Sequence, residues 1–263
     1  MAQLPAVKVS RRGAERIAAG HLWIYASDVT DRGEAQPGDA VKVLDPRGRA
    51  LGAAHYSSTS QICLRLLSTE VESIDREFFR RRLCAARDHR QRVVSGTDAY
   101  RLVHAEGDLL PALIVDRYGD YLVVQTLDQG MDRAKADIVA ALEGLFGPRG
   151  IVERNDATVR KREDLPLHTG MLAGAPPDQV QIRMNHLALA VDLLGGLKTG
   201  LFLDQRENYV AAARYARGQA LDCFTSSGGF ALHLAERCEG VEAVDSSAPA
   251  LAQAETNRRL NHI

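Results

Sequence analysis

The stretch ALDCFTSSGGFALHLAERCEGVEAVD, residues 220–245, decides the fold of the last part of the chain. The apolar run at 220–224 predicts a short buried strand, and the small residues from Thr225 to Gly229 predict a turn. A helix over 230–237 and a second strand over 240–244 follow. Because a helix connects the two strands, we expect them to be parallel neighbours in an α/β sheet.

Two acidic residues end these predicted strands. Asp222 ends the first strand, and Asp245 follows the second strand, 23 residues further on (245 − 222). A carboxylate at that offset suits the hydroxyl groups of a ribose. A carboxylate at Asp222 would repel a pyrophosphate and attract a cationic amino group. The pair therefore favours a ligand such as S-adenosylmethionine, which has an amino-acid end and a ribose end. An ordinary capped strand–helix turn is the alternative.

The residues before this stretch predict two further modules. The N-terminal module, residues 1–70, is small and mostly β, whereas the central module, residues 71–185, mixes helices and strands. The third module covers residues 186–263. Further strands are predicted over 6–9, 40–44, 49–56, 62–67, 113–116, 121–126, 150–154 and 187–191, and further helices over 11–19, 75–94, 133–146, 204–216 and 248–260.

Charge is distributed unevenly along the chain. Residues 1–100 hold 16 basic and 12 acidic residues, a net of +4, and the remainder holds 17 and 22, a net of −5. A basic N-terminal third favours contact with a polyanion. The predicted helix over 75–94 carries seven arginines. This basic face either meets solvent or contacts nucleic acid, and the sequence leaves both alternatives open.

Length and composition exclude several classes of protein. The chain has 263 residues, of which 45% are hydrophobic, as expected of a globular protein. It has no uninterrupted apolar run long enough to cross a membrane, and its first ten residues do not resemble a signal peptide, so we expect a cytoplasmic protein. The four cysteines form no C-x-x-C pair. We therefore expect no metal site and no disulfide framework, but four buried or half-buried thiols.

The run GLKTGLFLDQR at 196–206, together with the turn at 222–230, resembles the bacterial large-subunit ribosomal RNA methyltransferase I family. Members of this family are cytosine-C5 methyltransferases with an N-terminal PUA domain. The resemblance covers nearly the whole chain. It continues upstream in GHLWIY at 20–25, SQICLRLLS at 60–68, HAEGD at 104–108, LPALIVDRYGD at 110–120 and IVERND at 151–156.

The resemblance implies an α/β protein with three parts. These are a PUA β-barrel, a central α/β module, and the first half of a Rossmann-like class I methyltransferase domain. It also implies an S-adenosyl-L-methionine-dependent enzyme that methylates ribosomal RNA, with 23S rRNA cytosine C5 as the target. The implied cofactor-binding residues are Phe202, Asp204, Gln205, Arg206, Asp222, Phe224, Thr225, Gly228, Gly229 and Asp245. For Arg206, an ion pair on a helix surface is the alternative.

The PUA resemblance implies that RNA is the partner. PUA modules bind structured RNA through one face of a small barrel. Trp23 and Tyr25 either stack on bases or anchor the core of the module. The cations best placed for RNA are Lys8, Arg11, Arg12, Arg47, Arg49 and Arg65. A second copy of the chain is another candidate partner, which leaves a homodimer open.

The family's Asp-Pro-Pro catalytic loop and its nucleophilic cysteine have no counterpart in this sequence. We expect Cys223 and Cys238 to pack in the interior, so the catalytic residues stay unassigned. The resemblance therefore predicts a chain truncated at its C-terminus. A catalytically inactive RNA-binding protein is the alternative function. A nucleotide-dependent oxidoreductase is disfavoured, since the turn lacks G-x-G-x-x-G and carries Asp222.

Overall fold

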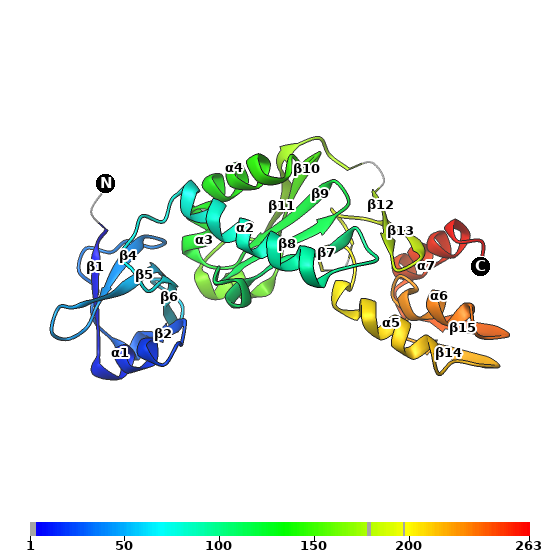
Figure 1. Cartoon of the computed structure of the whole chain (residues 1–263), viewed down its shortest axis with the longest axis horizontal. Coiled ribbons are helices and arrows are strands. Elements are labelled where there is room, and N and C mark those ends of the chain that lie inside the picture. The colour runs from blue at the N-terminus through cyan, green and yellow to red at the C-terminus, as the bar shows by residue number, and fades with distance from the viewer. Residues whose placement is uncertain (1–3, 178–179, 197) are drawn as a thin grey trace. The chain divides into compact units, whose positions relative to one another are not determined.

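The computed structural model describes residues 4–177, 180–196 and 198–263 (Figure 1). The chain forms two compact units. Unit 1 comprises Met1–Arg92, Leu102–Val115 and Val124–Ala175, and unit 2 comprises Val93–Arg101, Asp116–Val123 and Pro176–Ile263. No helix in the described part of the chain combines the length and the apolar character that a membrane crossing requires.

The N-terminal residues form a six-stranded sheet in the order β2-β6-β5-β4-β1-β3. Its pairs are antiparallel except for β1 and β4, which run parallel. The sheet is accompanied by helix α1 (Arg11–Ala18), which begins where the Ser10 side chain accepts a hydrogen bond from the Gly13 amide. The strands are β1 (Ala6–Val9), β2 (Trp23–Tyr25), β3 (Val29–Asp31), β4 (Ala40–Leu44), β5 (Ala50–Tyr56) and β6 (Ile62–Ser68).

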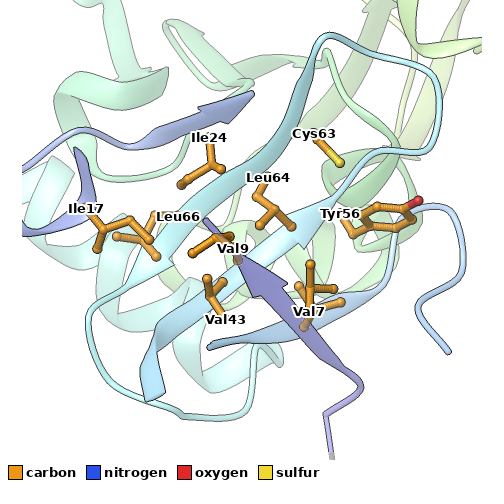
Figure 2. Close-up of a cluster of buried hydrophobic side chains, with 11 residues drawn as sticks. Val7, Val9, Ile17, Ile24, Val43, Tyr56, Cys63, Leu64 and Leu66 are labelled. Carbon is orange, nitrogen blue, oxygen red and sulfur yellow. The ribbon is translucent and has the colours of Figure 1, made fainter. Parts of the chain in front are cut away.

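Apolar side chains that alternate along these strands fill one core (Figure 2). Val7 and Val9 of β1, Val43 of β4 and Leu64 of β6 are all 0% exposed. Ile17 on the inner face of α1 packs into the same cluster. Successive strand residues point to opposite faces, so the period-two pattern of the sequence places these valines inside.

A second sheet has five strands in the order β11-β10-β9-β8-β7. The long helix α2 (Arg76–Val93) precedes it and buries Phe78, Phe79 and Leu83. The Asp75 carboxylate caps this helix by accepting hydrogen bonds from two backbone amides of its first turn. The other elements are β7 (Ala99–His104), β8 (Leu113–Tyr118), β9 (Tyr121–Thr126), α3 (Gln129–Arg133), α4 (Lys135–Phe146), β10 (Gly150–Asn155), η3 (Thr158–Glu163) and β11 (His168–Gly174).

The arginines of α2 are largely paired with acids. The pairs are Arg80 with Glu77, Arg81 with Glu72, Arg87 with Asp88, and Arg90 with Asp108. Each of these contacts partly neutralises the basic face that the sequence predicts. The Arg90 side chain is mostly buried in its ion pair, whereas those of Arg80 and Arg81 stay about half exposed, so both alternatives for this face stay open.

The C-terminal residues form a hairpin and a two-stranded parallel sheet. The hairpin pairs β12 (Val180–Met184) with β13 (Leu187–Val191), and the parallel sheet pairs β14 (Gln219–Cys223) with β15 (Gly240–Val244). Helix α6 (Gly229–Ala235) connects the parallel strands, as the strand–helix–strand pattern predicts (Figure 1). The 3-10 turn η4 (Leu203–Gln205) and helix α5 (Arg206–Ala213) precede β14, and α7 (Ala248–Leu260) follows β15.

Several predicted elements differ from the structure. The predicted helix over 133–146 corresponds to α4, whereas α3 before it was not predicted, and the predicted helix over 204–216 begins as a 3-10 turn. The strands β2, β3, β7, β11 and β12 were not predicted, and two of them have only three residues. So short a run carries too few residues to display a period of two. The module boundaries at residues 70 and 185 stay predictions.

Candidate cofactor site and nucleic-acid interface

The turn between β14 and α6 is fastened by Asp222. This residue is 8% exposed, and its Oδ2 atom accepts hydrogen bonds from the Thr225 hydroxyl at 2.6 Å and from the Ala231 amide at 3.0 Å. Between these contacts the backbone takes left-handed conformations at Phe224 and Ser226, with φ of 63° and 52°. The Asp222 carboxylate therefore fixes an unusual backbone path and caps α6.

Two predicted glycines of this turn are needed for different reasons, one for its backbone conformation and one for close packing. Gly228 has φ of 87°, a left-handed conformation that favours glycine. A Cβ atom added to Gly229 would overlap the ring of Tyr209 on α5, and that ring also contacts Phe230 edge-on at 4.7 Å between centroids. Gly228 thus permits the backbone of the turn, and Gly229 lets α5 pack directly against the start of α6.

Asp245 follows β15 and faces the same turn. Its Oδ2 atom accepts a hydrogen bond from the Ser226 amide at 2.9 Å, and its Oδ1 atom accepts one from the Ser247 amide at 2.9 Å. These backbone hydrogen bonds, first from Ser247 and then from Ser226, lower the pKa of the Asp245 carboxyl. An ionised carboxylate therefore lies beside the turn at neutral pH.

A hollow of about 270 Å³ lies beside this turn. Ser226 and Ser247, the two residues whose amides bind Asp245, contribute to its lining, as does Phe202. The remaining lining residues were not predicted as cofactor-binding residues: Asp192, Gly195, Gly196, Gly200, Leu201, Ser227, Pro249, Ala250 and Gln253. The cluster of Gly195, Gly196 and Gly200 was the available signal, since grouped glycines mark close backbone approach.

The far wall of the hollow, built from residues within 192–196 and 198–202, is anchored by buried polar side chains. The Thr199 hydroxyl donates to Asp116 at 2.6 Å, and the Leu201 amide donates to the Tyr118 hydroxyl at 3.1 Å. Asp116 is 0% exposed and also accepts two hydrogen bonds from Arg101. Burial, followed by the nearby Asp116 charge, raises the pKa of Tyr118 to about 12. The Lys-Thr-Gly run is thereby bound to β8; its neighbour Leu197 lies outside the described residues.

Of the ten predicted cofactor residues, Phe202 alone lines this hollow, and the other nine, Asp245 among them, do not. Asp204 is exposed and lies 3.9 Å from Lys198, and Gln205 accepts a hydrogen bond from Asn208 at 2.9 Å. Arg206 pairs with Glu207 at 3.0 Å. This last contact is the helix-surface ion pair that the sequence left open as the alternative for Arg206. Phe224 points into solvent, with 88% of its surface exposed.

The position of Cys223 contradicts a prediction made from the sequence. Its thiol was expected to pack in the interior, but the residue is exposed. Leu221, two residues earlier on β14 and on the same face, is 59% exposed. No described helix covers this face of the two-stranded sheet enough to bury them. Cys63 is buried, and Cys84 and Cys238 are half-buried, as expected.

Three of the predicted RNA-binding cations share a second hollow, in unit 1. Arg11 of α1, and Arg47 and Arg49 from the turn after β4, line a space of about 530 Å³. Arg11 pairs with Glu15 at 2.8 Å, and Arg49 pairs with Asp45 at 2.7 Å. Both guanidinium groups stay largely exposed, with 90% and 74% of their side-chain surfaces accessible. Lys8 and Arg12 do not line this hollow, and Arg12 pairs with Asp28 at 2.6 Å.

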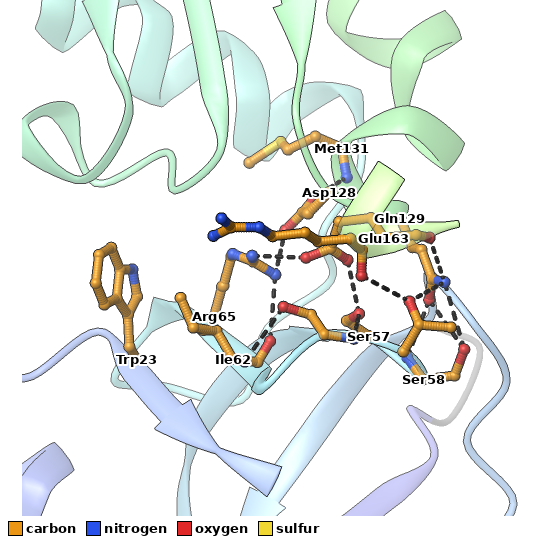
Figure 3. Close-up of polar contacts among 12 residues, drawn as sticks. Trp23, Ser57, Ser58, Ile62, Arg65, Asp128, Gln129, Met131 and Glu163 are labelled. Atoms are coloured by element: carbon orange, nitrogen blue, oxygen red, sulfur yellow. Dashed lines mark hydrogen bonds and ion pairs between the residues drawn. The ribbon is translucent and has the colours of Figure 1, made fainter. Parts of the chain in front are cut away.

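Arg65 lies elsewhere than the sequence predicts (Figure 3). It is 7% exposed, and its guanidinium binds Glu163 at 2.7 Å and lies 3.5 Å from Asp128. The Ser57 hydroxyl donates to the other oxygen of Glu163 at 2.6 Å. A cation held between two buried carboxylates is withdrawn from the surface, so this geometry does not present Arg65 to RNA.

The two predicted stacking aromatics have partners within the chain. The indole nitrogen of Trp23, labelled in Figure 3, donates to Glu106 at 2.8 Å, and the ring is 39% exposed. The guanidinium of Arg16 lies 5.1 Å from the centroid of Tyr25. Across the described residues, no group of three or more His, Cys, Asp or Glu side chains is arranged to hold a metal ion.

Comparisons with known proteins match the N-terminal residues to a domain family and nearly the whole chain to solved structures. A family model described as a PUA-like domain matches residues 7–69. A structure of a SAM-dependent methyltransferase from Streptococcus mutans superposes with a TM-score of 0.82, at 22% identity, over 99% of this chain and 68% of that one. A further solved methyltransferase, complexed with SAH, matches with the same TM-score over 67% of its length. These likenesses show a PUA-like domain followed by a Rossmann-like fold.

Curated relatives share more of the sequence. A protein named ribosomal RNA large subunit methyltransferase I from Tolumonas auensis is 41% identical over 92% of this chain and 63% of its own length. The protein of the same name from Cronobacter sakazakii is 37% identical over 97% of this chain and 66% of its own length. The chain thus spans slightly less than two thirds of these relatives. Over that span, the chain is similar to proteins named ribosomal RNA large subunit methyltransferase I.

Proposed function

We propose that this chain serves an S-adenosyl-L-methionine-dependent methyltransferase that acts on ribosomal RNA, with C5 of a 23S rRNA cytosine as the target. One observation carries the proposal: the ionised Asp245 carboxylate accepts hydrogen bonds from the amides of Ser226 and Ser247, and both of these serines line the hollow together with Gly200 of the Lys-Thr-Gly run. The names of the relatives support a ribosomal RNA substrate. The cytosine target rests on the family resemblance.

The cofactor would bind at the hollow through Asp245. A carboxylate has about four lone-pair positions, and two backbone amides occupy only some of them. The remaining positions can accept the two ribose hydroxyls. Asp222 holds the turn through Thr225 and Ala231, so it acts on the cofactor by fixing the backbone. When bound, the cofactor supplies the methyl group. The catalytic residues stay unassigned.

The RNA would meet the exposed cations of the N-terminal sheet. Arg11, Arg47 and Arg49 line one hollow, where acidic residues hold two of them in place without burying them. Guanidinium groups suit phosphate because they donate paired hydrogen bonds. We include Lys8 and Arg12 as neighbouring phosphate contacts. Work on ribosomal RNA is consistent with the predicted cytoplasmic location, whereas the homodimer has no support in the contacts of the described residues.

Isothermal calorimetry with S-adenosylhomocysteine tests the cofactor site. We expect the 263-residue chain to bind, and Asp245→Ala to weaken binding by at least tenfold, because the ribose loses its acceptor. Glu242→Ala is the matched control, since Glu242 is an exposed acid on β15, the strand that Asp245 follows, and does not line the hollow. Equal affinities of the two variants would contradict the assignment of Asp245.

Salt dependence tests the RNA surface. The Arg47→Gln/Arg49→Gln double variant should bind an rRNA fragment more weakly and with a shallower dependence on salt concentration, because fewer counterions are released. Arg80→Gln, a change on the paired face of α2, serves as the control. The alternative function, an RNA-binding protein without catalysis, predicts the same RNA result but no binding of S-adenosylhomocysteine.

A further inference from the structure

Three amide side chains, two on α7 and one on Asn261 at its C-terminal cap, occupy the free edge of β13. Asn261 accepts a hydrogen bond from the Ala188 amide at 2.9 Å and donates one to the Ala188 carbonyl at 2.7 Å. One helical turn earlier, Asn257 accepts from the Ala190 amide at 2.8 Å, and Gln253 donates to the Ala190 carbonyl at 2.8 Å. Residues four apart share one helix face, so the row takes the place of a strand partner.

Asn257 differs from the other two amides in what its second group binds. Its Nδ2 atom donates to the carbonyl oxygen of Ser227 at 3.0 Å, and the residue is 0% exposed. The Nδ2 atom of Asn261 instead donates to Ala188 and to the Asn257 carbonyl. A single buried amide therefore joins the edge of β13 to the turn between β14 and α6.

One attachment point, Ser227, lines the 270 Å³ hollow, and the other, Ala190, lies two residues before Asp192, which also lines it. The Asp192 carboxylate accepts hydrogen bonds from the Leu194 and Gly195 amides. We propose that Asn257 is a positioning residue that sets the separation of these two parts of the lining and thereby the affinity for S-adenosylmethionine. This inference rests on the proposed function of the hollow.

The chemistry of the site requires both a donor and an acceptor at this position. Asn257 satisfies an amide hydrogen on one side and a carbonyl oxygen on the other. An aspartate would keep the acceptor but place a negatively charged oxygen against the Ser227 carbonyl, because an ionised carboxylate has no hydrogen to donate. Asn257→Asp therefore breaks the contact with the turn and spares the contact with β13.

The matched experiment compares Asn257→Asp with Asn261→Asp. Both changes remove one donor on the same helix face, but only the first touches a wall of the hollow. We expect Asn257→Asp to weaken S-adenosylhomocysteine binding by about tenfold, the effect of roughly one buried hydrogen bond, and to speed amide exchange at residues 225–229 in the ligand-free chain. Asn261→Asp should leave both measurements near wild type.

A pH profile provides a readout that a merely structural role would not move. Protonation gives the new carboxyl group a hydrogen to donate to Ser227, so the affinity ratio of Asn257→Asp to wild type should return toward one as the pH falls. Equal effects of the two variants, or no effect of either, would overturn the proposal. So would the failure of both Asn257→Asp and Asn257→Ala to fold, because the residue would then serve folding itself. If the wild-type chain binds no S-adenosylhomocysteine, the proposed function fails, and amide exchange alone decides the role of Asn257.

Discussion

The N-terminal sheet and the parallel pair β14 and β15 differ in how their strands are stabilised. Leu64 and Val43 of the N-terminal sheet are 0% exposed within an eleven-residue apolar cluster (Figure 2). Leu221 of β14 is 59% exposed and Val244 of β15 is 39% exposed. The first region is therefore stabilised mainly by burial of apolar surface.

The second region depends instead on specific polar contacts. Asp222 fastens the turn after β14, Thr199 fastens the loop opposite, and Asn257 joins α7 to both β13 and the turn. A hydrogen bond contributes far less to stability than a fully buried leucine, but it fixes direction. In this chain, one region therefore provides stability, and another holds its backbone in a defined position.

The largest expected effect compares one leucine in each region. Leu64→Ala should lower the free energy of unfolding by about 2–5 kcal/mol, because it opens a cavity in a closed core. Leu221→Ala should change it by less than about 0.5 kcal/mol, since that side chain is mostly in solvent. Urea unfolding followed by the fluorescence of Trp23, the single tryptophan, measures the first change, and circular dichroism measures both. Similar losses in the two variants would break the comparison.

A smaller effect concerns His55, which lies on β5 in the N-terminal region. Burial, followed by the charge of Arg65, lowers the pKa of His55 to about 3, so the folded state keeps this ring neutral. The unfolded chain binds a proton near the usual pKa of about 6.5, so stability from this group is complete above that pH and declines as pH falls from 6.5 toward 3. At pH 5 the loss is about 2 kcal/mol.

His55→Phe should remove this part of the pH dependence. Asp128 acts in the opposite direction, because burial raises its pKa to about 6, so its contribution to stability grows as the pH falls from 6 toward 4. Since Asp128 is present in both proteins, subtracting their unfolding free energies between pH 7 and pH 5 isolates His55. Parallel pH profiles would show that the ring titrates normally, and that this face of β5 is less closed than its burial indicates.

The smallest expected effect is at Tyr118 of β8, whose hydroxyl holds the loop at Thr199 and Leu201. Tyr118→Phe removes the hydroxyl that accepts the Leu201 amide and contacts Thr199 at 3.1 Å. We expect a loss of about 1 kcal/mol and faster exchange of the Leu201 amide. The transition reported by Trp23 should stay unchanged. A change in that transition would mean that the two regions unfold together, which would remove the basis of the comparison.

Local patterns in the sequence were sufficient to predict most of the elements. The alternation of Val7, Val9, Val41 and Val43 predicted strands, and the order of strand, small-residue turn, helix and strand predicted parallel pairing of β14 with β15. Asp245 was predicted from its offset alone, and the structure places it at the turn. Its role toward a cofactor stays a proposal.

The remaining features depend on residues far apart in the chain. Arg65 is an exposed RNA contact by sequence, but Glu163, 98 residues away, draws it into a buried ion pair (Figure 3). Cys223 reads as an interior residue, but it lies on a sheet face that stays exposed. The sequence by itself determined most of the segments that become strands and helices, because periodicity is a property of neighbouring residues. Only the tertiary structure decided which charges are buried and which amides join two parts of a site, because burial and hydrogen bonding depend on the partners that folding brings together.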